Sequence, residues 1–109
     1  MVRRADIAAA APVFAALGDP TRLSVVIQLA SGGPQSIVRL TEGTRVTRQA
    51  ITKHLHALAK AGLVRSSREG RERIWEIQPR RLSDAGRYLD AISRSWDDAI
   101  ERLRAFVES

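Results

Sequence analysis

The residues best suited to bind a ligand lie between Val46 and Leu58, where polar and basic side chains recur at helical spacing. Large apolar residues four and three positions apart share one face of a helix: Ile51, Leu55 and Leu58. The outer face carries basic and hydrogen-bonding groups and no acid: Arg48, at its edge, Gln49, Thr52, Lys53, His56 and Lys60. Arg and Lys reach guanine edges and phosphates, Gln pairs with adenine, and Thr serves either purpose. The pattern predicts a helix over about residues 47–60 that lies in a DNA major groove.

The residues that follow this helix strengthen the prediction, because a basic helix face alone is also typical of ordinary solvated surface. Residues 63–68 and 71–77 are two β-prone runs around Glu69-Gly70, which predicts a hairpin over about residues 63–77. Its tip carries three arginines: Arg68, Arg71 and Arg73. A helix, a hairpin with a basic tip and then a long helix follow one another in the order of a winged helix-turn-helix domain.

Local sequence signals predict where the helices begin and end. Thr47 is the expected N-cap of the helix over residues 47–60, and Gly62 its C-terminal stop. An alanine-rich helix is expected over residues 3–17, with Pro12 either kinking it or beginning its firm part. Asp19-Pro20 predicts the start of the next helix, and Ser36 caps a short third one. The stripe expected to be buried in the second helix consists of Leu23, Val26, Ile27 and Ala30.

The last helix, expected over about residues 80–108, has an apolar seam more than three heptads long. Its residues step alternately by three and four: Leu82, Ala85, Leu89, Ile92, Trp96, Ala99, Leu103 and Phe106. An ordinary core helix has a similar periodicity, but this seam exceeds what so small a core can cover. Trp96 and Phe106 lie far from the winged region, which favours a two-fold homodimer seam assisted by the helix at residues 3–17.

Charge and composition limit the possible functions. The net charge of +6 is concentrated in residues 45–81, which hold ten Lys and Arg against three Glu. Such clustering indicates a polyanionic partner, and the segment lacks the bulky apolar face of a membrane-surface helix. The length of 109 residues predicts one small domain over residues 1–109. No run approaches the ~20 apolar residues of a membrane span, and Asp6 interrupts any signal-peptide pattern, so we expect a cytoplasmic protein.

Neither catalysis nor metal binding is predicted. The chain has no cysteine, which excludes disulfides, thiolate metal sites and thiol switches. Its histidines, His54 and His56, point to different sides of a helix and cannot chelate one ion together. His54 lies on the flank of the apolar stripe and is expected to pack there, whereas His56 faces outward, where it can touch a phosphate. No nucleophile–base pair and no phosphate-binding loop can be placed, so we expect no enzyme, metal or cofactor.

Several motifs together resemble the ArsR/SmtB family of bacterial transcriptional repressors, over about residues 10–108. Residues 14–23, FAALGDPTRL, resemble its opening signature, and residues 47–55, TRQAITKHL, running on to Ala61-Gly62-Leu63-Val64, resemble its recognition helix and entry to the wing. Residues 68–71, REGR, match the wing. Pro79, followed by a long helix with Trp96-Asp97, resembles the cysteine-free, non-metal branch. The resemblance implies a winged helix homodimer, built on the first and last helices, that binds an operator and usually represses.

The departures from the family concern sensing. Its metal sensors carry a cysteine motif on the third helix, where this chain has residues 36–40, SIVRL, and others use Asp and His pairs on a last helix that here has no histidine. The resemblance therefore extends to DNA binding and leaves any effector unidentified.

Together these features predict a mostly α-helical winged helix-turn-helix protein with a small β-hairpin and long N- and C-terminal dimerisation helices. The expected function is sequence-specific regulation of transcription on double-stranded DNA. The expected DNA contacts are Thr47, Arg48, Gln49, Thr52, Lys53 and His56 on the helix and Arg68, Arg71 and Arg73 on the wing. The alternative is a winged helix used for protein contact or for unspecific coating of the chromosome. Gln49 and Thr52 favour sequence-specific regulation, because unspecific phosphate binding needs only Lys and Arg.

Overall fold

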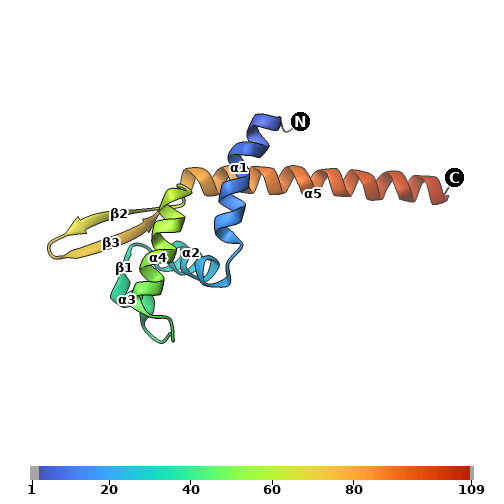
Figure 1. Cartoon of the computed structure of the whole chain (residues 1–109). Coiled ribbons are helices and arrows are strands. Elements are labelled where there is room, and N and C mark those ends of the chain that lie inside the picture. Colours follow the sequence, from blue (N-terminus) through green and yellow to red (C-terminus); the bar gives the residue numbers. More distant parts are fainter. Residues whose placement is uncertain (1–2, 109) are drawn as a thin grey trace.

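A computed structural model describes residues 3–108, which form helices packed at the base of a three-stranded antiparallel sheet (Figure 1). The elements follow in the order α1 (Arg4–Leu17), α2 (Pro20–Gly32), β1 (Gln35–Ser36), α3 (Ile37–Thr41), α4 (Arg48–Lys60), β2 (Val64–Glu69), β3 (Glu72–Ile77) and α5 (Pro79–Glu108). The predicted fold class, a winged helix-turn-helix, is confirmed. Two parts project from the body in opposite directions, the β2–β3 hairpin and the distal part of α5 (Figure 1).

The first two helices form as their end signals predict, with two corrections. Asp19 caps α2, because its carboxylate accepts the backbone N–H of Arg22 at 3.0 Å and Pro20 follows at the first helical position. Helix α1 begins at Arg4 and continues through Pro12, so its firm part does not begin at the proline. The stripe expected in α2 is wrong at three positions, because Leu23, Ile27 and Ala30 are exposed and the helix buries Val25, Val26 and Leu29. Apolar residues occupy more than one side of α2, so its periodicity alone does not select the buried face.

The helix-turn-helix consists of α3 and α4. Ser36 caps α3 through a 3.3 Å hydrogen bond from the backbone N–H of Arg39, as predicted. Thr47 caps α4 by accepting the N–H of Ala50 at 3.1 Å. Gly62, at a φ of 79°, ends the helix by taking a left-handed conformation that favours glycine. In the turn between the helices, Val46 is partly buried against the core.

The sheet has the strand order β1-β3-β2 and contains one strand more than the sequence indicated. Strand β1 pairs with β3 through Gln35 opposite Trp75 and Ser36 opposite Ile74. The hairpin closes with the pair Glu69 and Glu72, so its two loop residues are Gly70 and Arg71. Gly70 has a φ of 62°, which is the left-handed conformation that tight hairpin turns require. The expected tip is therefore displaced by one residue, and Arg71 lies within the loop.

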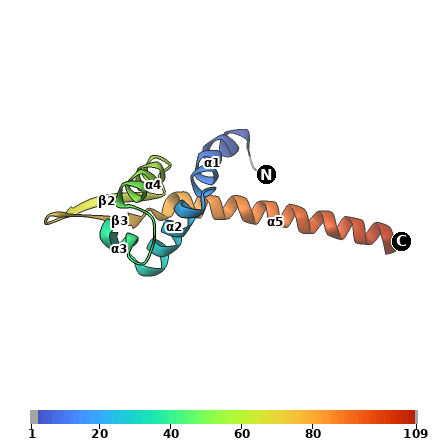
Figure 2. The same cartoon turned by 60° about the horizontal axis from the view of Figure 1, so that its bottom comes forward.

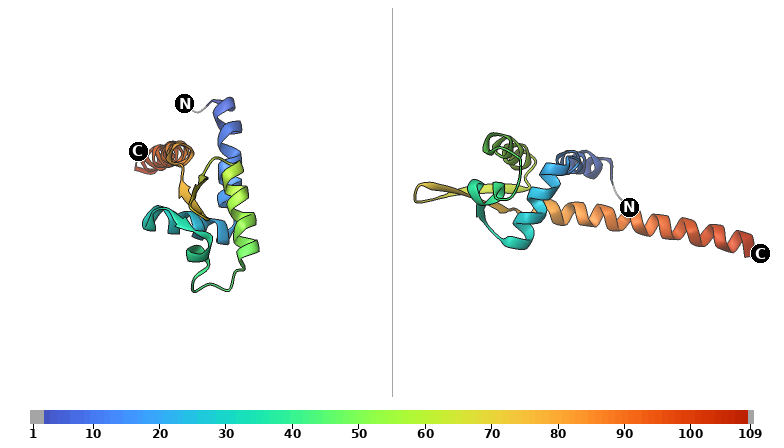
Figure 3. Two further views of the ribbon diagram at one scale, coloured as in Figure 1. Left: turned by 90° about the vertical axis from the view of Figure 1, so that its left-hand side faces the viewer. Right: turned by 90° about the horizontal axis from the view of Figure 1, so that it is seen from below.

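The core fills the space between the helices and the base of the sheet. Six of its side chains are almost fully enclosed: Leu40, Ile51, Leu55, Leu58, Leu63 and Val64. Trp75 from β3 and Ala85 from the first turns of α5 join the same cluster. Views from other sides show α4 and the hairpin next to each other at one end, with α5 leaving from the opposite end (Figures 2 and 3). This arrangement places the basic elements together and away from the distal α5.

Candidate nucleic-acid interface

The outer face of α4 is the first part of the candidate interface. Ile51, Leu55 and Leu58 are at most 2% exposed and fix the inner face of this helix. The remaining side chains consequently point away from the body. Five of the six residues expected to contact DNA on this helix are exposed, and Thr52 is half-buried: Thr47, Arg48, Gln49, Thr52, Lys53 and His56. The structure thus brings all six to one surface.

Two hydroxyl groups on this face are already engaged inside the helix. The Thr47 hydroxyl accepts the N-cap bond, and the Thr52 hydroxyl donates to the backbone carbonyl of Arg48 at 2.7 Å. A hydroxyl that donates back to its own helix retains acceptor capacity and its methyl group for an outside partner. The side chains of Arg48, Gln49 and Lys53 make no hydrogen bond or ion pair within residues 3–108, so their donors remain open to a ligand.

The hairpin is the second part of the candidate interface, and its arginines differ in their partners. Arg65, near its base, pairs with Glu76 at 2.7 Å across the strands. Arg73 donates to the Ser66 hydroxyl at 2.8 Å. Arg68 and Arg71 are exposed and form no ion pair among residues 3–108. Within residues 3–108, neither Glu69 nor Glu72 forms an ion pair with one of the tip arginines.

The two histidines lie in different surroundings, as their spacing predicted. His54 is half-buried on the flank of α4, with its Nδ1 3.9 Å from the Asp19 carboxylate. The hydrogen bond from the Arg22 backbone N–H holds the pKa of Asp19 below its ordinary value, and the positive charges of His54 and Arg22 act in the same direction. His56 is on the outer face, where its ring packs against Trp75. No group of three His, Asp or Glu side chains within residues 3–108 is arranged to hold a metal ion.

Helix α5 begins inside the body and leaves it. Ala85 is 5% exposed and belongs to the chain's own core, and Leu82 packs against that core. In the single chain these two seam positions thus pack against the chain's own body, where α1 lies next to the first turns of α5. The remaining large seam residues are exposed: Leu89, Ile92, Trp96, Leu103 and Phe106. Ile100 and Val107, which the sequence reasoning missed, extend this exposed stripe, and their spacing of four residues from Trp96 and Leu103 was the available signal.

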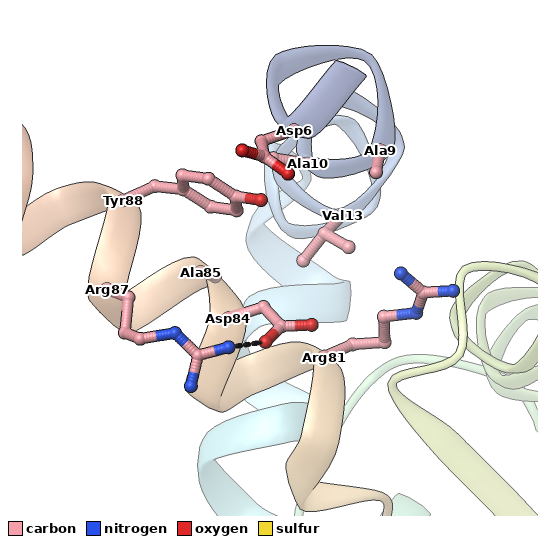
Figure 4. A pocket seen from close by; sticks show the side chains of 9 residues that line it. All are labelled: Asp6, Ala9, Ala10, Val13, Arg81, Asp84, Ala85, Arg87 and Tyr88. Atoms are coloured by element: carbon pink, nitrogen blue, oxygen red, sulfur yellow. Dashed lines mark hydrogen bonds and ion pairs between the residues drawn. The ribbon is translucent and has the colours of Figure 1, made fainter. Parts of the chain in front are cut away.

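A polar pocket of about 250 Å³ marks the junction of α1 and α5 (Figure 4). Small side chains of both helices line it, together with Asp6, Tyr88 and an Arg87–Asp84 ion pair (Figure 4). Arg81 also lines it and extends over Gly62 at the end of α4, since a Cβ at Gly62 would lie 3.0 Å from the Arg81 Cγ. The start of α5 is thereby packed against the end of α4.

Comparison with known proteins places this geometry in a family. A helix-turn-helix domain family matches residues 17–67. An uncharacterized HTH-type transcriptional regulator of Methanocaldococcus jannaschii is 31% identical over 83 residues, which cover 76% of this chain and 93% of that protein. An ArsR-like transcriptional regulator from Rhodococcus sp. RHA1 superposes with a TM-score of 0.74 at 37% identity, covering 92% of this chain and 93% of that one. The chain belongs to the ArsR/SmtB family of helix-turn-helix transcriptional regulators.

Two further proteins are similar to this chain. The HTH-type transcriptional repressor SmtB of Mycobacterium tuberculosis is 30% identical over 92 residues, covering 84% of this chain and 66% of that protein. A homodimeric winged helix-turn-helix DNA-binding domain from Mycobacterium bovis has a TM-score of 0.62 at 25% identity, covering 88% of this chain and 85% of that one.

Within residues 3–108 no single helix is long and apolar enough to cross a membrane, although α1 and α2 taken together, with a 95° bend, meet that test by length and composition.

Proposed function

We propose that this ArsR/SmtB-family chain is a homodimeric, sequence-specific DNA-binding repressor that recognises an inverted-repeat operator. The observation that carries the proposal is the outer face of α4. Arg48 and Gln49 extend from a helix seated on buried Ile51, Leu55 and Leu58, and their donors have no partner within residues 3–108. A rigid helix with open, base-reading donors on one side is what readout in the major groove requires.

Sequence-specific binding is supported by the kinds of side chain on this face. Lys53 and Lys60 provide charge for the phosphate backbone, which gives affinity without discrimination. Gln49 offers a bidentate amide to adenine, and Arg48 a bidentate guanidinium to guanine. The exposed Arg68 and Arg71 of the hairpin then supply backbone or minor-groove contacts beside the helix. Unspecific coating would leave the amide of Gln49 without a role, because phosphate contacts need only Lys and Arg.

Dimerisation is supported by the exposed stripe of α5. The helix has 30 residues and is about 45 Å long, but Ala85 is its one buried residue within the described chain. Trp96 is 68% exposed and Leu103 64%, and large contiguous apolar surface of this kind marks an interface. An apolar groove between α1 and α5, lined by Ile7, Ala10, Ala11, Phe14, Tyr88 and Ile92, continues the stripe. The homodimeric neighbour from Mycobacterium bovis is consistent with a second copy as the occupant.

A two-fold axis through the α5 seam relates two α4 helices, so each half of a palindromic operator meets one helix. The half-sites are then expected about one helical turn apart, near 34–36 Å. Repression is supported by the similarity to the repressor SmtB, because a dimer bound over a promoter blocks access to it.

The decisive experiment isolates genomic fragments that the purified protein retains, sequences them and measures competition by random DNA. We expect an enriched inverted repeat that random DNA displaces poorly, and a reporter under that promoter that is silenced when the protein is expressed. Equal competition by random DNA would contradict sequence-specific binding, and a reporter that becomes more active would contradict repression.

A further inference from the structure

An aromatic contact joins α4 to the central strand of the sheet. The rings of His56 and Trp75 have centroids 5.7 Å apart and planes inclined at 86°, which is an edge-to-face arrangement. Trp75 lies on β3, between Gln35 of β1 and Ser66 of β2, and is 2% exposed. Edge-to-face pairs stabilise a structure beyond the apolar area that they bury. The contact therefore links the position of α4 to that of the hairpin.

Trp75 has no polar anchor of its own. Its indole Nε1–H is buried and has no hydrogen-bond partner within residues 3–108. The orientation of this side chain consequently depends on packing, and on the α4 side its ring contact is His56. An exposed histidine that packs on a buried tryptophan is in a position to fix that tryptophan and the strand that carries it.

The hairpin amplifies any change at its base. Residues 67–73 are all exposed, so the tip has no support from the body. Trp75 is opposite Ser66, so the part of the hairpin beyond this contact, up to the loop at Gly70, is about four residues or roughly 13 Å long. A tilt of about 10° at the base would move Arg71 by roughly 2 Å, which exceeds the tolerance of a hydrogen bond to a phosphate.

We propose that His56 is a positioning residue that sets the angle between α4 and the hairpin through its ring, and thereby places Arg68 and Arg71 against the DNA backbone. The inference rests on the proposed DNA-binding function. It assigns His56 a role other than the phosphate contact that its outward position suggests, because its ring faces Trp75. His56 shares one face of α4 with Gln49, Thr52 and Lys53, because helical residues three, four and seven positions apart lie on the same side. Its contact with Trp75 therefore lies next to the bound DNA.

The test compares two substitutions that separate the ring from its nitrogens. His56→Phe keeps an aromatic ring and removes both nitrogens, whereas His56→Gln keeps hydrogen-bonding groups and removes the ring. We expect His56→Phe to bind the operator within about twofold of the wild type, and His56→Gln to bind roughly three- to tenfold more weakly, the size of one edge-to-face contact. A His56→Gln variant that binds as the wild type does, or a His56→Phe variant as weak as His56→Gln, overturns the proposal.

A second arm tests whether the effect passes through the hairpin. In a protein that also carries Arg68→Ala and Arg71→Ala, His56→Gln should reduce the affinity for DNA by no more than about twofold. A loss of unchanged size means that His56 acts on DNA directly and overturns the proposal. Both experiments measure the affinity for operator DNA and for random DNA, because the hairpin can contact the phosphate backbone of any sequence. A wild type that shows no preference for its operator contradicts the proposed function, while the ratio of the two variants on random DNA still decides the role of His56.

Discussion

His54 of α4 lies 3.9 Å from Asp19, the residue that caps α2, so one carboxylate contacts the N-terminus of one helix and the flank of another. Because the folded protein holds the pKa of Asp19 below its ordinary value, the ionised form stabilises the fold. That contribution is present above the unfolded pKa, about 3.9, and is lost as the pH falls through the lower folded value.

We therefore expect the melting temperature of the wild type to fall between about pH 5 and pH 3 more steeply than that of Asp19→Asn. Asparagine is an equally good N-cap, so this variant removes the titrating charge and keeps the cap. Thermal unfolding followed by circular dichroism at several pH values measures the difference. Parallel pH profiles for the two proteins would show that Asp19 does not supply this stability.

Removal of a base-reading side chain on α4 should reduce specific binding more than unspecific binding. Arg48→Ala and Gln49→Ala are each expected to lose about 1–3 kcal/mol on the operator and less on random DNA. Fluorescence anisotropy with both DNAs at one salt concentration gives the two values. If both substitutions weaken the two DNAs equally, these side chains do not read bases.

The hairpin arginines should contribute through phosphate charge. Arg71→Ala is expected to lower the slope of log K against log salt by about one unit, the effect of one lost phosphate contact. Arg65→Ala is the matched control on the same hairpin, since Arg65 is engaged with Glu76, and should change the slope less. An unchanged slope for Arg71→Ala would remove the hairpin tip from the interface.

A charged side chain in the seam on α5 should prevent dimerisation. Trp96→Glu places a carboxylate within the exposed apolar stripe and is expected to yield monomers that bind the operator weakly. Arg94→Glu introduces the same carboxylate about 200° around the helix and should remain dimeric. Sedimentation at micromolar concentration distinguishes the two states. A Trp96→Glu dimer that binds DNA fully, or a monomeric wild type, would rule out this seam.

Micromolar Zn²⁺ is expected to leave operator affinity unchanged. The sequence contains no cysteine, and His54 and His56 are directed to separate partners, Asp19 and Trp75. Carboxylates alone bind borderline metals weakly. The measurement is operator binding with and without Zn²⁺, using protein from which the purification tag has been removed. Release from DNA on addition of Zn²⁺ would contradict the prediction.

Much of the candidate interface follows from local sequence, because short-range signals decide it. The caps at Asp19, Ser36 and Thr47 act over three residues, and the apolar residues of α4 lie on a single side. A helix with one apolar side can bury that side and no other, so local sequence alone puts Arg48, Gln49 and Lys53 on the outer face. The two-residue loop of the hairpin needs Gly70 for the same local reason.

Tertiary structure decided what local periodicity leaves open. Apolar residues occupy more than one side of α2, so its orientation depends on α1, α4 and β3, which cover Val25, Val26 and Leu29. The pairing of β1 with β3 joins residues about forty positions apart, and no local pattern specifies such a contact. The heptads of α5 run without interruption, yet α1 covers Ala85 and not Trp96. Periodicity determines which residues share a face, whereas the position of the neighbouring elements determines how much of that face remains exposed to a partner.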